Sequence, residues 1–201
     1  MKIGILGGTF NPVHNGHIAL ARRAKEGFNL DKVVFMPAGN SYFKKGVLPI
    51  VRRLEILRAA LPKEFEVSEL ESDESKPTYS CDTFEYLHKT YPEDQFYMIL
   101  GFDCLESVYY WREPAKLLAN CELIAATREG SSMESLKRTA ENLEKRFGGR
   151  VHLLEFPDIE ISSTTIRERI FRGESIEGLV PKEVEGLVVR YEKETEKLQS
   201  E

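Results

Sequence analysis

Cysteine is scarce in this chain of 201 residues, occurring only as Cys81, Cys104 and Cys121. The number is odd, the positions lie far apart, and no two of them form a C-x-x-C pair. A disulfide framework and a structural zinc site both depend on paired cysteines, so both are disfavoured. A reducing, cytoplasmic location fits this pattern best.

The sequence also lacks an excess of basic charge and any long apolar run. Its formal net charge of −5 offers no positive field to a polyanion such as nucleic acid, although a local anion pocket is compatible with it. No window approaches the length of a signal-peptide core or a membrane span. We therefore expect no nucleic-acid or membrane partner. Periodicity does not identify subunit surfaces, so the oligomeric state, a homo-oligomer included, is left open.

Short apolar runs alternate with helical patterns along the chain. The expected strands are residues 3–6, 33–36, 65–67, 96–100, 123–126 and 151–154. The expected helices are residues 17–26, 51–60, 81–91, 114–120, 133–147 and a charged terminal segment, 182–197. This alternation predicts a doubly wound α/β fold with a mostly parallel sheet and a C-terminal helical segment. The length and the 41% hydrophobic content suit one domain over residues 1–201.

The loop after the first expected strand is the most informative segment. Residues 7–17 read G-G-T-F-N-P-V-H-N-G-H and run into a helix. Gly7 and Gly8 let a backbone approach phosphate closely, and a helix start supplies N–H donors with partial positive charge. His14 and His17 are three residues apart, so they share a face and can neutralise one anion together. We predict a phosphate site here.

Other interpretations of this loop fit less well. The Walker pattern G-x-x-x-x-G-K-[ST] is absent, and the glycines do not follow the G-x-G-x-x-G spacing of dinucleotide-binding dehydrogenases. A zinc site on the two histidines would need a third ligand, and neither His88 nor His152 is on an element expected nearby. A plain glycine turn with solvated histidines explains each feature alone, but their combination favours phosphate binding.

A second segment, near the C-terminal end, offers similar chemistry. Residues 161–167 read I-S-S-T-T-I-R. Hydroxyl side chains here can cap a helix whose free N–H groups face an anion, and Arg167 offers a planar fork of donors that matches phosphate oxygens. Alone, the segment is typical of an ordinary helix cap followed by a solvated arginine. With the first loop, it predicts a triphosphate bound between two helix starts.

The two segments together resemble the nucleotidylyltransferase superfamily. Residues 9–17 are similar to its T-F-[DN]-P-x-H-x-G-H signature, and residues 161–167 to its I-S-S-T-x-[IV]-R motif. The resemblance implies a Rossmann-like nucleotidylyltransferase fold in which both histidines bind ATP and stabilise its α-phosphoryl group. The ATP-binding residues predicted in this way are Gly7, Gly8, Thr9, Phe10, His14, His17, Gly101, Asp103, Ser163, Thr164 and Arg167.

The middle of the chain resembles the nicotinate-nucleotide adenylyltransferases. Residues 37–44 are similar to their P-x-x-x-P-P-H-K loop, although residues 41–43 read Ser-Tyr-Phe in place of Pro-Pro-His. Residues 78–83 resemble S-Y-T-x-[DE]-T, and residues 101–105 resemble G-x-D-x-L, with a tryptophan following. The predicted mononucleotide-binding residues are Thr9, Asn40, Lys44, Tyr79, Ser80, Thr83 and Trp111.

Elementary chemistry supports several of these assignments. Lys44 can neutralise phosphate, hydroxyls and amides at a helix start suit a nicotinate carboxylate, and the indole of Trp111 can stack on a pyridinium ring. Asp103 can accept ribose hydroxyls or help to hold hydrated magnesium. Arg128 also matches a family arginine, but its role is left open, as is that of residues 41–43.

The reaction implied by the resemblance is transfer of the AMP part of ATP to nicotinate mononucleotide, giving deamido-NAD and pyrophosphate in NAD biosynthesis. Mg²⁺ would accompany ATP as its counter-ion, without a metal site built by the protein. The residues predicted to take part in catalysis are His14, His17, Lys44 and Arg167. Two alternatives stay open: the same chemistry on nicotinamide mononucleotide or phosphopantetheine, and a sensor that binds nucleotides without catalysis.

Overall fold

The structure, a computed structural model, describes residues 1–40, 46–101, 104–127, 133–157 and 159–200. Strands and helices alternate along it, as the sequence predicts. The strands are β1 (Lys2–Gly8), β2 (Lys32–Pro37), β3 (Phe65–Val67), β4 (Gln95–Leu100), β5 (Glu122–Thr127) and β6 (Val151–Glu155). The α-helices are α1 (Asn15–Gly27), α2 (Ile50–Ala60), α3 (Ser80–Thr90), α4 (Pro114–Asn120), α5 (Met133–Phe147), α6 (Ser163–Phe171) and α7 (Glu185–Ser200). The described residues also include the short 3-10 helices η2 (Glu106–Tyr110) and η3 (Lys182–Val184).

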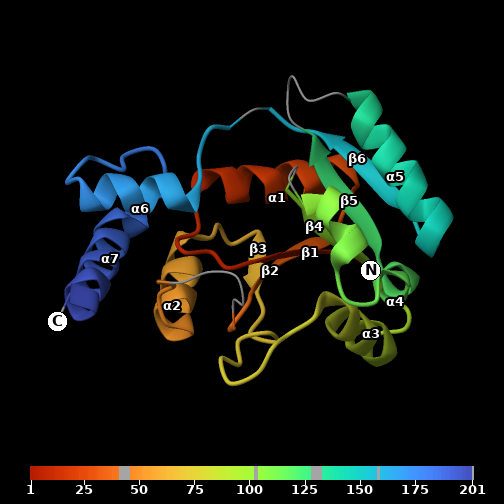
Figure 1. Ribbon diagram of the computed structural model, residues 1–201, viewed down its shortest axis with the longest axis horizontal. Helices are drawn as coiled ribbons and strands as arrows, with labels where there is room; N and C mark the ends of the chain where they lie inside the picture. Colours follow the sequence, from red (N-terminus) through yellow and green to blue (C-terminus); the bar gives the residue numbers. More distant parts are fainter. Residues whose placement is uncertain (41–45, 102–103, 128–132, 158, 201) are drawn as a thin grey trace. The chain divides into compact units, whose positions relative to one another are not determined.

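The strands form one sheet in the order β3-β2-β1-β4-β5-β6, and β4 pairs in parallel with both β1 and β5, as β5 does with β6 (Figure 1). This confirms the predicted doubly wound α/β fold. The strand order reverses between β1 and β4, where Leu6 pairs with Ile99. In such sheets the ligand crevice lies outside the carboxyl ends of the strands at this reversal. Gly7 and Gly101 stand at those two strand ends.

Two compact units make up the chain. The first unit comprises residues 1–7, 20–35 and 78–158, and the second comprises residues 8–19, 36–77 and 159–201. Both segments that the sequence analysis assigns to phosphate binding belong largely to the second unit. The single domain expected from chain length stays a prediction.

The first unit contains most of the sheet and the helices that cover it. Residues 123–126 of β5 are at most 3% exposed, because strands covered on both faces are apolar throughout. Helix α3 packs on β4 and α4, while α5 packs on β6 and α4, as Figure 1 shows for α5 and β6. This burial explains why the strands are recognisable as continuous apolar runs in the sequence.

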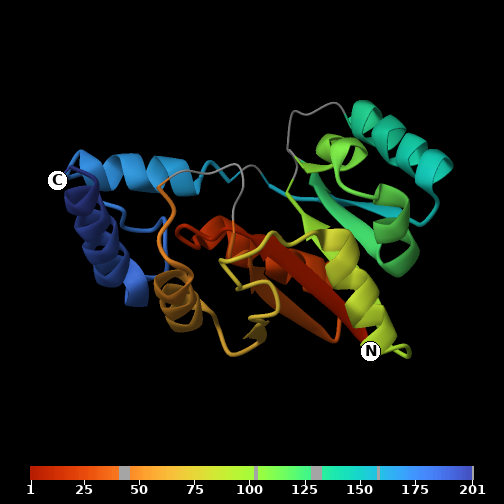
Figure 2. The same cartoon turned by 60° about the horizontal axis from the view of Figure 1, so that its bottom comes forward.

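The second unit contains α2, α6 and α7, and α7 packs against both of the others (Figure 2). The terminal helix predicted over residues 182–197 is present, but its first turn is the 3-10 helix η3, which follows Pro181. The Val184 amide donates to the Pro181 carbonyl at 3.0 Å, which closes this tighter turn. Within the described ranges, no helix is both long enough and apolar enough to cross a membrane.

Candidate active site

The segment between β1 and α1, residues 9–14, is called the first loop below. Phe10 has φ 48°, a left-handed backbone conformation that side chains rarely adopt. Its ring lies against Gly8, since a Cβ added there would stand 3.1 Å from ring atoms. Residue 8 is therefore glycine to accommodate Phe10. A Cβ added to Gly7 would meet no described atom within 4 Å, so the backbone there is open to a ligand.

His14 and His17 form a stacked pair at the end of this loop. Their ring centroids are 3.6 Å apart with an angle of 27° between the planes. The His14 backbone N–H donates to Nδ1 of His17 at 3.2 Å. When neutral, His17 must then carry its proton on Nε2, which becomes a hydrogen-bond donor. The sequence predicts two imidazoles aimed at one anion, and the structure places them side by side.

Burial changes the charge expected for His14. The residue is 7% exposed, and this desolvation lowers its pKa from 6.5 to about 4. In the protein without ligand, His14 is therefore neutral at physiological pH. A bound polyphosphate would raise the pKa again, because a nearby negative charge favours the protonated form. A Cβ on Gly16 would stand 3.1 Å from Nδ1 of His14, so a larger residue at position 16 would press on that ring.

The start of α1 is not a set of free donors, in contrast to the prediction. The Asn15 amide donates to the Leu179 carbonyl at 2.9 Å, and the Asn15 side chain donates to the Gly178 carbonyl at 2.8 Å. The amide of His17 donates back to the His14 carbonyl at 2.9 Å. The segment before η3 therefore occupies part of this helix start, which disfavours these amides as the groups that bind an anion.

Helix α6 docks on the first loop and brings the second signature to it. Arg167 donates through Nη1 to the Asn11 carbonyl at 2.5 Å, and Ser163 donates through Oγ to the Pro12 carbonyl at 2.8 Å. The cap of α6 is Ser162, whose Oγ accepts from the Thr165 amide at 3.0 Å. The two distant signatures therefore meet within one unit, as predicted, although the hydroxyl of Ser163 holds the loop instead of capping the helix.

Arg167 also donates through Nη2 to Oγ1 of Thr164, at 3.4 Å. A guanidinium has five N–H donors, so Arg167 retains donors for a ligand after these two bonds. A carboxylate from α7, Glu192, interacts electrostatically with Arg167. Glu192 is 2% exposed, and its Oε1 has no hydrogen-bond partner among the described residues. Burial raises the pKa of Glu192 from 4.5 to about 7.

The acceptor loop, residues 37–45, is described only as far as Asn40. The side chain of Asn40 donates to the Glu74 carbonyl at 3.4 Å. Gly39 lies against a neighbouring backbone, since a Cβ on it would stand 2.6 Å from the carbonyl of Ser72. Several predicted residues lie outside the described part of the chain, namely Lys44, residues 41–43, Asp103 and Arg128.

The first unit contains the remaining predicted mononucleotide residues. Tyr79 is the residue that precedes α3, and its carbonyl accepts from the amides of Asp82 and Thr83 at 2.9 and 3.1 Å. The Arg112 guanidinium lies 4.4 Å from the centroid of the Tyr79 ring. Ser80, Thr83 and Trp111 are half-buried, and the Trp111 indole N–H donates to Ser107 Oγ at 3.0 Å. A half-buried indole with its N–H satisfied suits ring stacking better than a place in the core.

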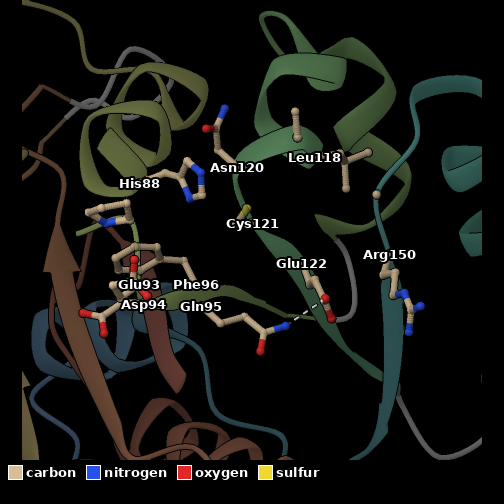
Figure 3. Close-up of a pocket in the computed structure, with 13 residues that line it drawn as sticks. His88, Glu93, Asp94, Gln95, Phe96, Leu118, Asn120, Cys121, Glu122 and Arg150 are labelled. Atoms are coloured by element: carbon tan, nitrogen blue, oxygen red, sulfur yellow. Dashed lines mark hydrogen bonds between the residues drawn. The ribbon is translucent and has the colours of Figure 1, made fainter. Parts of the chain in front are cut away.

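The first unit contains a cavity of about 550 Å³ (Figure 3). It lies at the amino ends of β4 and β5, where Gln95, Phe96, Cys121 and Glu122 line it. Gly101 follows the opposite end of β4. The side chain of Gln95 donates to Glu122 Oε1 at 3.0 Å, shown as a dashed line in Figure 3. This cavity is therefore not the nucleotide crevice expected at the carboxyl ends.

A group of metal-binding side chains is formed by Cys81, Asp82 and Glu113 in the first unit, with ligand atoms within 4.8 Å of one another. Lys116 Nζ already pairs with Asp82 Oδ1 at 2.7 Å, which occupies the group with a cation. We assign it no metal. The histidines considered as further zinc ligands are used elsewhere: His152 Nε2 lies 2.6 Å from Glu122 Oε2, and His88 lines the cavity at the amino ends.

Sequence reasoning missed three residues that shape the site: Gly16, Arg53 and Glu192. Arg53 and Glu192 occur where a helical pattern calls for an apolar residue, and this mismatch is the signal that could have revealed them. Arg53 is next to Leu54 on the buried side of α2, and Glu192 is four residues after the buried Val188.

Comparison with known proteins agrees with this geometry. The chain matches the family described as cytidylyltransferase-like over residues 5–169. It is 41% identical to a probable nicotinate-nucleotide adenylyltransferase of Carboxydothermus hydrogenoformans, covering 94% of this chain and 95% of that protein. A protein of the same description from Clostridium novyi is 36% identical, covering 93% of this chain and 96% of the relative.

Solved structures show the same fold at lower identity. The Plasmodium falciparum nicotinic acid mononucleotide adenylyltransferase complexed with NaAD has a TM-score of 0.76 at 18% identity, covering 94% of this chain and 95% of that one. A putative nicotinate-nucleotide adenylyltransferase from Vibrio parahaemolyticus has a TM-score of 0.63 at 18% identity, with 94% and 92% covered. With its Rossmann-like sheet and both signatures in place, this chain belongs to the nicotinate-nucleotide adenylyltransferases of the cytidylyltransferase-like family.

Proposed function

We propose that this chain transfers the AMP part of ATP to nicotinate mononucleotide, forming deamido-NAD and pyrophosphate. The observation that carries the proposal is the junction of α6 with the first loop. There the Arg167 guanidinium is fixed on the Asn11 carbonyl at 2.5 Å, and the loop ends at His14, whose ring stacks on that of His17 in the first turn of α1. Imidazole and guanidinium donors gathered in this way suit a polyphosphate.

The chemistry is an in-line substitution at the α-phosphorus of ATP. An oxygen of the acceptor 5′-phosphate forms a bond to that phosphorus, the bond to the bridging oxygen of the leaving group breaks, and pyrophosphate leaves with the electron pair. The attacking phosphate is already ionised near neutral pH, so no protein nucleophile or general base is required. Catalysis then depends on alignment of two anions and on donors that stabilise the charge of the transferring group.

Each donor of the second unit has a distinct part in this scheme. His17 donates from Nε2 to the α-phosphoryl oxygen, because its Nδ1 is occupied by the His14 amide. His14 and Arg167 contact the β- and γ-phosphates and stabilise the pyrophosphate as it leaves. Lys44 and Asn40, on the acceptor loop, contact the attacking phosphate.

Mg²⁺ enters this scheme with ATP, as the counter-ion of its triphosphate. The described residues of the first loop and of the α6 start offer imidazole, guanidinium and hydroxyl groups, without the carboxylates that Mg²⁺ prefers. This donor set fits phosphate oxygens and leaves the metal to be held by ATP and water. When bound, Mg²⁺ neutralises charge on the phosphates.

The acceptor's pyridine ring is assigned to the first unit, where Trp111 stacks on it and the start of α3 contacts its substituent. Charges of both signs meet at that helix start: the Arg112 guanidinium lies 4.4 Å from the ring centroid of Tyr79 and pairs with Glu113 at 3.6 Å, and Asp82 is in the first turn of α3. The choice of the acid over the amide is supported by the similarity to nicotinate-nucleotide adenylyltransferases.

A pyrophosphate-release assay tests the proposal. The purified protein is mixed with ATP and Mg²⁺, and nicotinate mononucleotide, nicotinamide mononucleotide, phosphopantetheine or buffer is added in parallel. We expect pyrophosphate and a dinucleotide product with the first acceptor at the highest kcat/KM. Equal or greater rates with another acceptor would assign the protein to that substrate. Nucleotide binding without pyrophosphate from any acceptor would identify a sensor and reject the enzyme.

A further inference from the structure

Arg53 is an unusual residue for the middle of a buried helix face. It lies on α2 and is 1% exposed, among the fully buried side chains of the described residues. Burying a charged group is costly unless hydrogen bonds replace the water that it loses. The side chain must therefore have a dense set of partners, and they show what it does.

The partners of Arg53 are four backbone carbonyls. Nη1 donates to the carbonyls of Thr9 and Ala38, each at 2.8 Å. Nη2 donates to the Gly39 carbonyl at 3.1 Å, and Nε donates to the Leu48 carbonyl at 2.8 Å. Four of the five N–H donors of the guanidinium are used in this way. Because the group is buried and so engaged, it acts on the backbone and does not contact substrate.

Three of these carbonyls come from the two loops that bear the proposed substrate contacts, and the fourth, that of Leu48, lies just before α2. Thr9 belongs to the first loop, which leads to the histidine pair, whereas Ala38 and Gly39 precede Asn40 in the acceptor loop. Further bonds join the same segments, since the Ala38 amide donates to the Gly8 carbonyl at 3.0 Å.

The link continues from these loops to α6. Asn11, which is 3% exposed, accepts from the Leu48 amide through Oδ1 at 3.0 Å, while its own carbonyl accepts from Arg167. All of these residues belong to the second unit. Arg53 is thus the cation at the centre of a network that reaches from the acceptor loop through the first loop to Arg167.

We propose that Arg53 is a positioning residue that fixes the first loop and residues 37–40 of the acceptor loop in register, so that the attacking phosphate is aligned with the α-phosphorus. This inference rests on the proposed function. Misalignment of two bound reactants reduces the rate of their reaction more than it reduces the affinity for either one. The expected signature of a lost Arg53 is therefore a lower kcat with ATP affinity retained.

The test compares Arg53→Lys with Arg58→Lys, a matched change on the exposed side of α2. Lysine keeps the positive charge of residue 53 but replaces a planar fork by a single ammonium, which does not reach all four carbonyls. At a temperature where circular dichroism shows both variants folded, kcat and KM for each substrate and the Kd of a non-hydrolysable ATP analogue are measured. We expect a fall in kcat of about tenfold or more for Arg53→Lys, with the Kd within about threefold of wild type. Arg58→Lys should match wild type.

A second variant tests the same alignment without changing Arg53, should Arg53→Lys fail to fold. In Gly39→Ala the new Cβ would meet the Ser72 backbone at 2.6 Å, so the acceptor loop must shift relative to its supports. The same selective loss of kcat is expected. If wild type is active and the folded variants have unchanged kcat, the role of Arg53 is overturned while the proposed function stands. Wild type that releases no pyrophosphate with any acceptor would overturn the proposed function, and this role with it.

Discussion

Two buried titratable residues of the second unit should affect stability in opposite directions as pH changes. Glu192 on α7 is 2% exposed, and its pKa is raised from 4.5 to about 7 by burial. His14 is 7% exposed, and its pKa is lowered from 6.5 to about 4 by the same physical cause. In each case burial disfavours the charged form, but the charged form is the deprotonated one for Glu192 and the protonated one for His14.

The sign of each contribution follows from which state binds more protons. Between pH 4.5 and 7, the folded protein retains a proton on Glu192 that the unfolded chain has lost, so the free energy of unfolding falls as pH rises. Between pH 4 and 6.5, the unfolded chain binds a proton on His14 that the folded protein does not, so the free energy of unfolding rises. Each contribution amounts to about 3 kcal/mol over its full range. They largely cancel between pH 4.5 and 6.5.

Because the two contributions largely cancel, removing one titratable group should reveal how the other makes the free energy of unfolding depend on pH. We expect Glu192→Gln to gain stability relative to wild type as pH rises from 4.5 to 7, by up to about 3 kcal/mol. His14→Gln should lose stability relative to wild type by a similar amount between pH 4 and 6.5. Urea unfolding followed by circular dichroism, without nucleotide and at closely spaced pH values from 4 to 8, measures both differences.

Differences between variants are the appropriate quantity, because exposed groups contribute nearly equally to all the proteins and cancel. Glu194→Gln is the matched control on α7: Glu194 is 45% exposed and pairs with Arg52 at 3.0 Å. The same curves for this variant show the effect of removing one exposed carboxylate from α7. Parallel curves for wild type and Glu192→Gln would refute the inference that Glu192 is buried and protonated near neutral pH. Parallel curves for wild type and His14→Gln would refute the inference that the His14 imidazole is desolvated and neutral.

Three further predictions concern the site. His17→Ala should lower kcat by about 100- to 1,000-fold with an unchanged circular dichroism spectrum, since it removes a donor to developing charge; unchanged turnover would exclude that role. Gly16→Ala should weaken binding of an ATP analogue in calorimetry, because its Cβ would stand 3.1 Å from Nδ1 of His14 and must displace the ring; wild-type affinity would contradict this. Arg167→Lys should lower kcat/KM for ATP, since an ammonium cannot hold both the Asn11 carbonyl and a phosphate in the geometry of a planar fork; steady-state kinetics at saturating acceptor should show no such loss if Arg167 only packs.

The sequence by itself determined the fold and the chemical character of the site. Strands covered on both faces must be apolar throughout, so β4 and β5 are visible as uninterrupted apolar runs. The residue types at positions 7–17 and 161–167 predict a phosphate site, because glycine, imidazole and guanidinium groups have few other shared uses at strand ends and helix starts. These features are local in the chain and need no knowledge of distant contacts.

Only the tertiary structure decided how those groups are held and charged. The sequence predicts free amides at the start of α1, yet residues 178–179 occupy part of that start. It does not reveal that burial lowers the pKa of His14, which leaves the ring neutral. It gives no role to Arg53 or Glu192, whose partners come from segments far away in the chain. Desolvation and hydrogen-bond satisfaction depend on which distant segments surround a group, and composition and periodicity carry no record of that.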